Sequence, residues 1–215
     1  MDFSEPMIRR GHPPLSRTQK KNSLSHLCSF HKVSLFIVVF TLSFHLPNFI
    51  PGFQWGQTNR EQTIKEIVEV LDKQPTDLAN VTREELAEVI YEEAIRYNQD
   101  PKFILALIAI ESEFYNWSVS EKGAKGLMQI MPYVGKSLAQ ELGIEWSGDQ
   151  TLFNPYLNIR MGIYYLSQLM LDFKDVGMAL TAYNYGPTYV RGLIDRKERI
   201  PHNYSRRVLT AYKSI

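Results

Sequence analysis

The residues best suited to acid–base chemistry in this sequence are Glu111 and Glu113, which follow directly on an apolar stretch. Residues 103–110 are all apolar, and a helix that is apolar on every side is a buried helix. A carboxyl group at the end of such a helix loses hydration, which favours its neutral form and raises its pKa. A carboxylic acid that stays protonated near neutral pH can donate a proton to a leaving oxygen, such as that of a glycosidic bond.

The pattern barely separates the two glutamates. At helical spacing Glu111 neighbours Leu107, Ile108 and Phe114, which predicts the less hydrated environment for it. The alternative is that Glu111 simply turns to solvent at the end of its helix, and Glu113 competes for the same role.

Nucleophilic and metal-based chemistry find little support in the sequence. Ser112 lies in no G-x-S-x-G segment and has no evident triad histidine, so we expect a structural or hydrogen-bonding role for it. Only His202 among the five histidines lies after residue 45, which argues against a histidine-based metal site. Cys28 is the one cysteine, so it forms no intrachain disulfide.

Aromatic side chains with a polar tip are abundant in the second half of the chain. All twelve tyrosines lie at or beyond Tyr91, and such side chains suit the binding of sugar rings. An aromatic-rich helical core would give the same composition. Residues 183–187, Tyr-Asn-Tyr-Gly-Pro, are more informative because Gly and Pro end a helix there and present Tyr183 and Asn184 in a defined place.

The charge balance gives no reason to expect a nucleic-acid partner. The net charge is +1, whereas nucleic-acid binding favours a clustered basic face. The exception is residues 191–215, where seven Lys and Arg face only Asp195 and Glu198. This stretch is either a solvated face or a surface that meets an anionic polymer.

The N-terminal part of the chain has the pattern of a targeting segment. Residues 1–32 contain six Lys and Arg, and residues 33–50 that follow are free of Asp, Glu, Lys and Arg. Eighteen such residues just reach the length that crosses a bilayer. The basic flank predicts a single-pass anchor with the remainder exported. A cleaved signal peptide, giving a secreted protein, is the alternative.

The remainder reads as nearly all helix, so we predict an all-α fold. Residues 51–59 are expected to be a linker. Residues 51–80 together form a linker and accessory helix, and residues 81–215 a catalytic domain. Capping residues, prolines and terminal glycines place further helices at residues 82–97, 102–113, 132–142, 155–171, 175–185, 187–196 and 201–212.

Four ordered motifs resemble the lytic transglycosylase domain of the soluble-lytic-transglycosylase type, a lysozyme-like family. They cover roughly residues 86–212, and their order and spacing make the resemblance specific. The matching segments are Glu111-Ser112, residues 123–132 (GAKGLMQIMP), residues 154–166 with Asn158 and Gly162, and residues 182–187 (AYNYGP).

The resemblance implies a peptidoglycan lytic transglycosylase with an α-helical, grooved domain. It implies that Glu111 acts as general acid and then base on the MurNAc–GlcNAc β-1,4 bond, forming a 1,6-anhydromuramoyl end without metal or cofactor. Peptidoglycan glycan strands are the implied partner. The substrate-binding residues implied are Ser112, which would orient the glutamate or contact the sugar, together with Gln129, Met131, Tyr183, Asn184 and Tyr204.

The sequence departs from the family pattern after Ile200-Pro201. An expected Glu-Thr-Arg segment is missing there, so the loop before Tyr204 is shorter by about four residues. Three alternatives stay open. They are a hydrolase of the same fold, a non-catalytic peptidoglycan-binding protein, and an enzyme that opens the wall locally for a secretion or cell-wall machinery.

Overall fold

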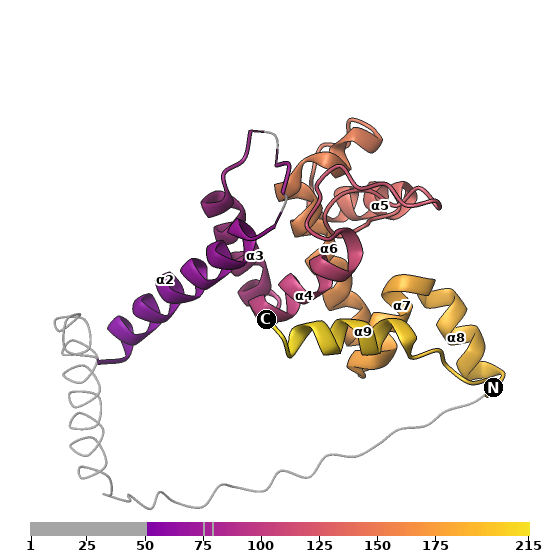
Figure 1. Ribbon diagram of the computed structural model, residues 1–215. Coiled ribbons are helices and arrows are strands. Elements are labelled where there is room, and N and C mark those ends of the chain that lie inside the picture. The colour runs from indigo at the N-terminus through magenta and orange to yellow at the C-terminus, as the bar shows by residue number, and fades with distance from the viewer. Residues whose placement is uncertain (1–50, 75, 79) are drawn as a thin grey trace, which may run out of the picture. The chain divides into compact units, whose positions relative to one another are not determined.

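The computed structural model describes residues 51–74, 76–78 and 80–215 (Figure 1). Within this part of the chain the only β pairing consists of two isolated bridges, from Lys125 to Val119 and to Ile130. The mainly helical fold predicted from the sequence is therefore confirmed. The elements in chain order are α2 (Pro51–Asp72), α3 (Arg83–Arg96), α4 (Pro101–Ser112), α5 (Pro132–Leu142), the 3-10 helix η1 (Asp149–Phe153), α6 (Pro155–Phe173), α7 (Val176–Tyr185), α8 (Pro187–Asp195) and α9 (Asn203–Tyr212).

Helix starts follow the capping residues that the sequence contains. Thr82 and Glu85 form a reciprocal capping box, in which the Glu85 amide donates to Thr82 Oγ1 at 3.1 Å and the Thr82 amide donates to Glu85 Oε2 at 2.9 Å. The carboxylate of Asp100 caps α4, and the side chain of Asn154 caps α6. Each cap satisfies an amide that has no partner inside its helix.

Two local predictions differ from the structure. Helix α2 begins at Pro51 and so includes residues 51–59, which the sequence predicted as a linker. Proline is tolerated in the first turn of a helix, and the glycines that follow lower helix propensity without blocking it. The short helix η1 was not predicted, because five residues are too few to show helical periodicity.

Helix α4 lies in the core of the compact unit formed by Gln54–Ile215. It packs against α3 and α9, and α9 runs alongside both α4 and α7 (Figure 1). From Phe103 to Ile108 every side chain of α4 is at most 6% exposed. Each large apolar side chain buried this fully contributes about 1.5–3 kcal/mol, so α4 is a fixed frame for the residues at its end.

The predicted membrane segment, residues 33–50, and the basic segment, residues 1–32, lie outside the described residues. Among the residues that are described, no helix is both long and apolar enough to cross a membrane.

Candidate active site

The end of α4 separates the two candidate glutamates. Glu111 lies in the last turn of α4 and is partly buried. Glu113 and Phe114 then adopt left-handed backbone conformations, with φ of 52° and 63°, which ends the helix. The reversal leaves Glu113 exposed and buries Phe114 to 3% exposure. Glu111 is therefore the desolvated carboxyl of the pair.

Tyr204 of α9 holds the carboxyl group of Glu111. The Tyr204 hydroxyl donates a hydrogen bond to Glu111 Oε1, and Tyr204 itself is buried, with 6% of its surface exposed. Burial raises the pKa of Glu111 to about 7, while the hydrogen bond from Tyr204 and the positive charge of Arg207 act in the lowering direction. The direction of this shift is the one expected from the sequence for a carboxyl group at the end of a buried helix. Near neutral pH this carboxyl group is populated in both its protonated and its ionised form.

Ser112 ties the end of α4 to the loop that follows residue 122. Its hydroxyl donates to the carbonyl of Leu127 at 2.8 Å and to that of Ile108 at 3.3 Å. The residue is 8% exposed. Both features favour a role in fixing the helix end and the loop over direct contact with a sugar.

Asn158 of α6 fixes that loop through hydrogen bonds of its side chain. Its side-chain oxygen accepts from the Met128 amide at 2.8 Å, and its amide group donates to the carbonyls of Lys125 and Leu152 at 3.0 and 2.8 Å. Asn158 is fully buried. One side chain thus hydrogen-bonds to three backbone groups. Losing it would leave the buried Met128 amide and Leu152 carbonyl without this partner, whereas the Lys125 carbonyl also accepts from the Ile130 amide.

Glycines allow the loop to approach α6 so closely. Gly126 has φ of +80°, and a Cβ atom there would lie 2.2 Å from the Asn158 side chain. A Cβ atom on Gly162 would lie 2.4 Å from the sulfur of Met128. Since Asn158 and Gly162 are four residues apart, they share one face of α6. These two close approaches therefore account for the glycines at positions 126 and 162.

Tyr183 of α7 ties the same loop to the C-terminal helices. Its hydroxyl donates to the Met128 carbonyl at 2.8 Å. Burial, and next to it the negative charge of Glu111, holds the pKa of Tyr183 well above its usual value. The second influence shows that Glu111 lies close to this side chain.

A cleft of about 550 Å³ lies beside this scaffold and brings four of the predicted site residues together. Gln129, Met131, Tyr183 and Asn184 all line it, and the Gln129 amide is held by the carbonyls of Ser118 and Gly126. Glu111, Ser112 and Tyr204 are not among the residues that line the cleft. Among the described residues, those lining the cleft include no Asp or Glu. They are Lys122, Gln129, Ile130, Met131, Tyr133, Val134, Tyr165, Tyr183, Asn184, Tyr185, Gly186, Pro187, Thr188 and Tyr189.

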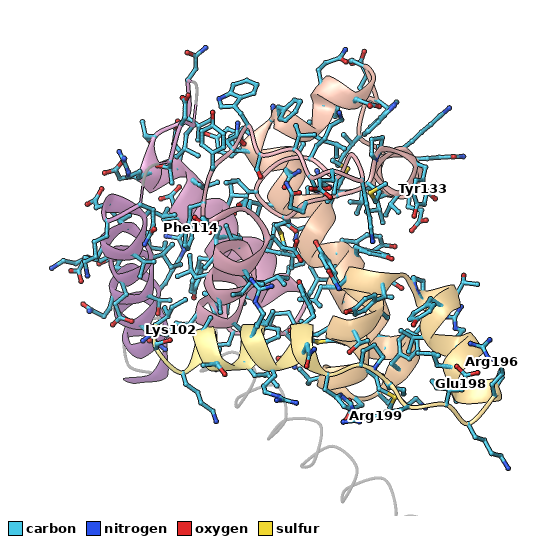
Figure 2. The ribbon with its side chains drawn as sticks, turned by 45° about the vertical axis from the view of Figure 1, so that its right-hand side comes forward. Lys102, Phe114, Tyr133, Arg196, Glu198 and Arg199 are labelled. Carbon is cyan, nitrogen blue, oxygen red and sulfur yellow. The ribbon has the colours of Figure 1, made fainter. Side chains whose placement is uncertain are left out.

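Several residues of the site were not among those singled out from the sequence. Tyr133 on α5 and Tyr189 on α8 line the cleft, and Figure 2 shows Tyr133 at the surface of α5. Only the abundance of tyrosine after residue 91 hinted at them. Asn158 belonged to a recognised motif, but its role depends on contacts with residues 30 and 33 positions away.

Across residues 51–74, 76–78 and 80–215, no group of three or more His, Cys, Asp or Glu side chains is placed to hold a metal ion.

Comparison with known proteins places these features in one family. The chain is 30% identical over 131 residues to membrane-bound lytic murein transglycosylase C of Actinobacillus pleuropneumoniae, covering 60% of this chain and 36% of that protein. It is 45% identical over 74 residues to endo-type membrane-bound lytic murein transglycosylase A of Klebsiella pneumoniae, covering 33% of this chain and 36% of that protein. The chain therefore spans about a third of the length of these relatives.

A solved structure supports the fold. The 70 kDa soluble lytic transglycosylase of Escherichia coli superposes with a TM-score of 0.51 at 26% identity, covering 61% of this chain and 25% of that one. The sequence model described as "Transglycosylase SLT domain" matches residues 88–204, more than half of the chain, and ends at the tyrosine that binds Glu111. This chain therefore belongs to the transglycosylase SLT domain family.

Proposed function

We propose that this protein is a peptidoglycan lytic transglycosylase that cleaves the MurNAc–GlcNAc β-1,4 bond and leaves a 1,6-anhydromuramoyl end. One observation carries the proposal, which is that the carboxyl group of Glu111 is partly buried at the end of α4 and is held there by the buried Tyr204 hydroxyl. Burial raises the pKa of this group to about 7. A general acid that must later act as a base works best when its pKa is near the working pH. The names of the relatives, which are lytic murein transglycosylases, agree with this activity.

In the first step protonated Glu111 gives its proton to the glycosidic oxygen. The bond from that oxygen to C1 of the muramoyl sugar breaks, and the GlcNAc side departs with a free hydroxyl. Positive charge develops at C1. Most glycosidases stabilise it with a second carboxylate, but the cleft of this protein is lined by no Asp or Glu among its described residues. The carbonyl oxygen of the sugar's own N-acetyl group serves that purpose instead.

In the second step ionised Glu111 removes the proton from the C6 hydroxyl of the same sugar. The O6 atom then attacks C1 and closes the anhydro ring. Glu111 regains the proton it gave away, so the enzyme returns to its starting state and no water is consumed. The Tyr204 hydroxyl keeps the carboxyl group oriented through both transfers. Neither step requires a metal or a cofactor.

The competing reaction is attack by water at C1. An enclosed site disfavours it because fewer water molecules reach the reacting carbon. Tyr204, which contacts Glu111, is buried, and desolvation is the main cause of the raised pKa of Glu111. This environment supports ring closure over hydrolysis.

We further propose that residues 33–50 anchor the protein in a membrane, with residues 51–215 on the exported, periplasmic or extracellular side. The charge-free run after a basic segment supports this, and two relatives carry "membrane-bound" in their names. The prediction is that the full chain stays in the membrane pellet after a carbonate wash. Recovery of a shortened chain in the soluble fraction would indicate a cleaved signal peptide instead.

Mass spectrometry of the products tests the proposed reaction. Purified peptidoglycan is digested with the full chain and, in parallel, with the variants Glu111→Gln and Glu113→Gln. We expect anhydromuramoyl ends, lighter by one water than hydrolytic ends, from the wild type and from Glu113→Gln, and none from Glu111→Gln. Reducing ends would establish a hydrolase of the same fold. Binding without any product would favour a non-catalytic role.

A further inference from the structure

Trp117 is a large aromatic residue that the proposed mechanism does not use. It is 41% exposed, and it is not among the residues that line the cleft. Trp146, in contrast, packs against the hydrophobic core. A single exposed apolar side chain is normal on a protein surface, so a binding role for Trp117 depends on what surrounds it.

The short helix η1 holds the ring of Trp117 in place. The ring centroid lies 5.3 Å from that of Phe153, the last residue of η1, and the two ring planes are 34° apart. The neighbouring Asn116 is fully buried, and its side-chain amide donates to the Phe153 carbonyl at 2.9 Å. A ring that is already held by its neighbours loses little conformational freedom when a ligand binds. Trp117 therefore offers a preorganised aromatic surface to solvent.

Polar groups that can bind hydroxyls adjoin the same phenylalanine. The Nζ atom of Lys125 lies 5.8 Å from the centroid of the Phe153 ring and 3.7 Å from a carboxylate oxygen of Asp149. The side chain of Asp149 is 55% exposed. The amine donates hydrogen bonds and the carboxylate accepts them. We call Trp117, Phe153, Lys125 and Asp149 the tryptophan platform. Its aromatic face and its polar pair match a sugar, which has an apolar ring face and a rim of hydroxyls.

The tryptophan platform and the cleft are built on the same loop after α4. The carbonyl of Ser118, the residue that follows Trp117, accepts a hydrogen bond from the side-chain amide of Gln129 at 3.1 Å. A backbone bridge joins Lys125 to Ile130, and both Gln129 and Ile130 line the cleft. These contacts fix the platform relative to the cleft, so a long polymer can contact both.

We propose that the tryptophan platform is a second binding site for the glycan strand of peptidoglycan, in which a sugar ring stacks on Trp117 and its hydroxyls bond to Lys125 and Asp149. The inference rests on the proposed function, which supplies the polymer. A glycan strand repeats the same two sugars, so rings outside the cleft are available for stacking. A second contact on one polymer raises the effective concentration of the strand at the first. The platform thus keeps the enzyme on its substrate and takes no part in the chemical steps.

Co-sedimentation with insoluble peptidoglycan tests the platform. The full chain carries Glu111→Gln in every sample, so that binding is measured without turnover. We expect Trp117→Ala to weaken binding about fivefold, the size of one aromatic contact, and Trp117→Tyr, which keeps an aromatic face, to retain most of the affinity. The matched control is Tyr115→Ala, which should leave binding unchanged. Tyr115 lies on the same loop and is 45% exposed, but it stacks on no other ring among the described residues. Unchanged binding in Trp117→Ala, or an equal loss in Tyr115→Ala, would overturn the inference.

Quenching of tryptophan fluorescence by acrylamide reports on the Trp117 indole itself. Soluble glycan strands should protect the Glu111→Gln protein from quenching, because a stacked sugar covers the exposed ring. The protection should be lost in Trp117→Tyr, which still binds the strands but lacks the fluorescent ring. Equal protection in the two proteins would contradict stacking on Trp117. Thermal unfolding of each variant checks that the fold is retained.

The dependence on strand length separates this inference from the proposed function. In the otherwise unaltered full chain, Trp117→Ala should lower kcat/KM about fivefold on long strands and leave the rate on a tetrasaccharide, which occupies the cleft alone, unchanged. An equal loss on both substrates would contradict a second site. A loss of binding confined to Trp117→Ala supports the platform even if the wild type forms reducing ends. Anhydro ends together with unaltered binding by Trp117→Ala would overturn the platform alone.

Discussion

Two regions of the candidate active site hold their side chains in different ways. The buried scaffold, formed by Ser112, Asn158 and Tyr204, is at most 8% exposed, and each member makes a hydrogen bond across the fold. The exposed wall of the cleft, formed by Tyr133, Tyr185 and Tyr189, is 43–72% exposed. In the wall, Tyr185 and Tyr189 contact each other, with ring centroids 5.8 Å apart.

This difference separates residues that position Glu111 from residues that contact the substrate. Buried polar groups are costly unless their hydrogen bonds are complete, so the buried scaffold admits few arrangements and fixes the carboxyl of Glu111. Substitutions in the exposed wall should cost little free energy of folding, and its tyrosines offer aromatic faces to a polymer. Substitutions in the buried scaffold should therefore change the rate, the pH dependence or the stability, whereas substitutions in the exposed wall should change mainly KM.

The largest effect is expected at Glu111 itself. Glu111→Gln keeps the shape of the side chain but removes the transferable proton, so kcat should fall by about 10²- to 10⁴-fold, the usual contribution of acid–base catalysis. Glu113→Gln, two residues away on an exposed side chain, should retain wild-type kcat. Release of soluble muropeptides measures both. Comparable losses in the two variants would mean that the end of α4, and not one carboxyl, matters.

The next largest effect is expected at Asn158, where substitution should lower the stability of the fold. Asn158→Ala leaves the buried Met128 amide and Leu152 carbonyl without their partner, at a cost of about 1–3 kcal/mol for each unsatisfied group, so we expect a loss of about 2 kcal/mol or more. Asn154→Ala on the same helix removes only an N-cap and should cost about 1 kcal/mol. Urea unfolding compares them. Equal losses would show that the loop does not depend on Asn158.

Substitution of Tyr204 should change the pH dependence of kcat more than the stability of the fold. Its hydrogen bond to Glu111 favours the carboxylate and so lowers the pKa of Glu111. In Tyr204→Phe this effect is lost and the pKa rises. Because the first step needs the protonated acid, activity falls as pH increases through this pKa, and the alkaline limb of kcat should move to higher pH. An unmoved or lowered limb in a folded Tyr204→Phe protein would argue against the contact.

The smallest effect is expected in the exposed wall. Tyr133→Ala or Tyr189→Ala should raise KM for glycan strands about fivefold, since an aromatic contact is worth about 0.5–1.5 kcal/mol, and leave kcat unchanged. Tyr115→Ala is the matched control, because Tyr115 is 45% exposed and does not line the cleft. A fall in kcat without a change in KM would place these tyrosines in the scaffold instead.

The sequence predicted the elements that depend on near neighbours. Thr82 and Asp100 cap the helices expected of them, because a cap and its target amide are only two or three residues apart. The buried character of α4 followed from its uninterrupted apolar run. The four motifs, taken with the family resemblance, indicated Gln129, Met131, Tyr183 and Asn184, and the structure brings these into one cleft.

What the sequence could not predict depends on long-range contacts. Glu111 and Tyr204 are 93 residues apart, and no periodicity links them. Glu111 and Glu113 differ only because the backbone turns left-handed at Glu113 and Phe114, a conformation that neither residue type signals.

Direct titration of Glu111 tests the central claim. The carboxyl carbons of the full chain are labelled with ¹³C-glutamate, and the Glu111 resonance is identified by its absence from the Glu111→Gln protein. Its chemical shift is then followed as a function of pH. We expect a midpoint near 7, because desolvation raises the pKa of this partly buried carboxyl group. A midpoint near the ordinary value of 4.5 would mean that Glu111 is solvated and ionised at neutral pH, and would contradict its role as the general acid.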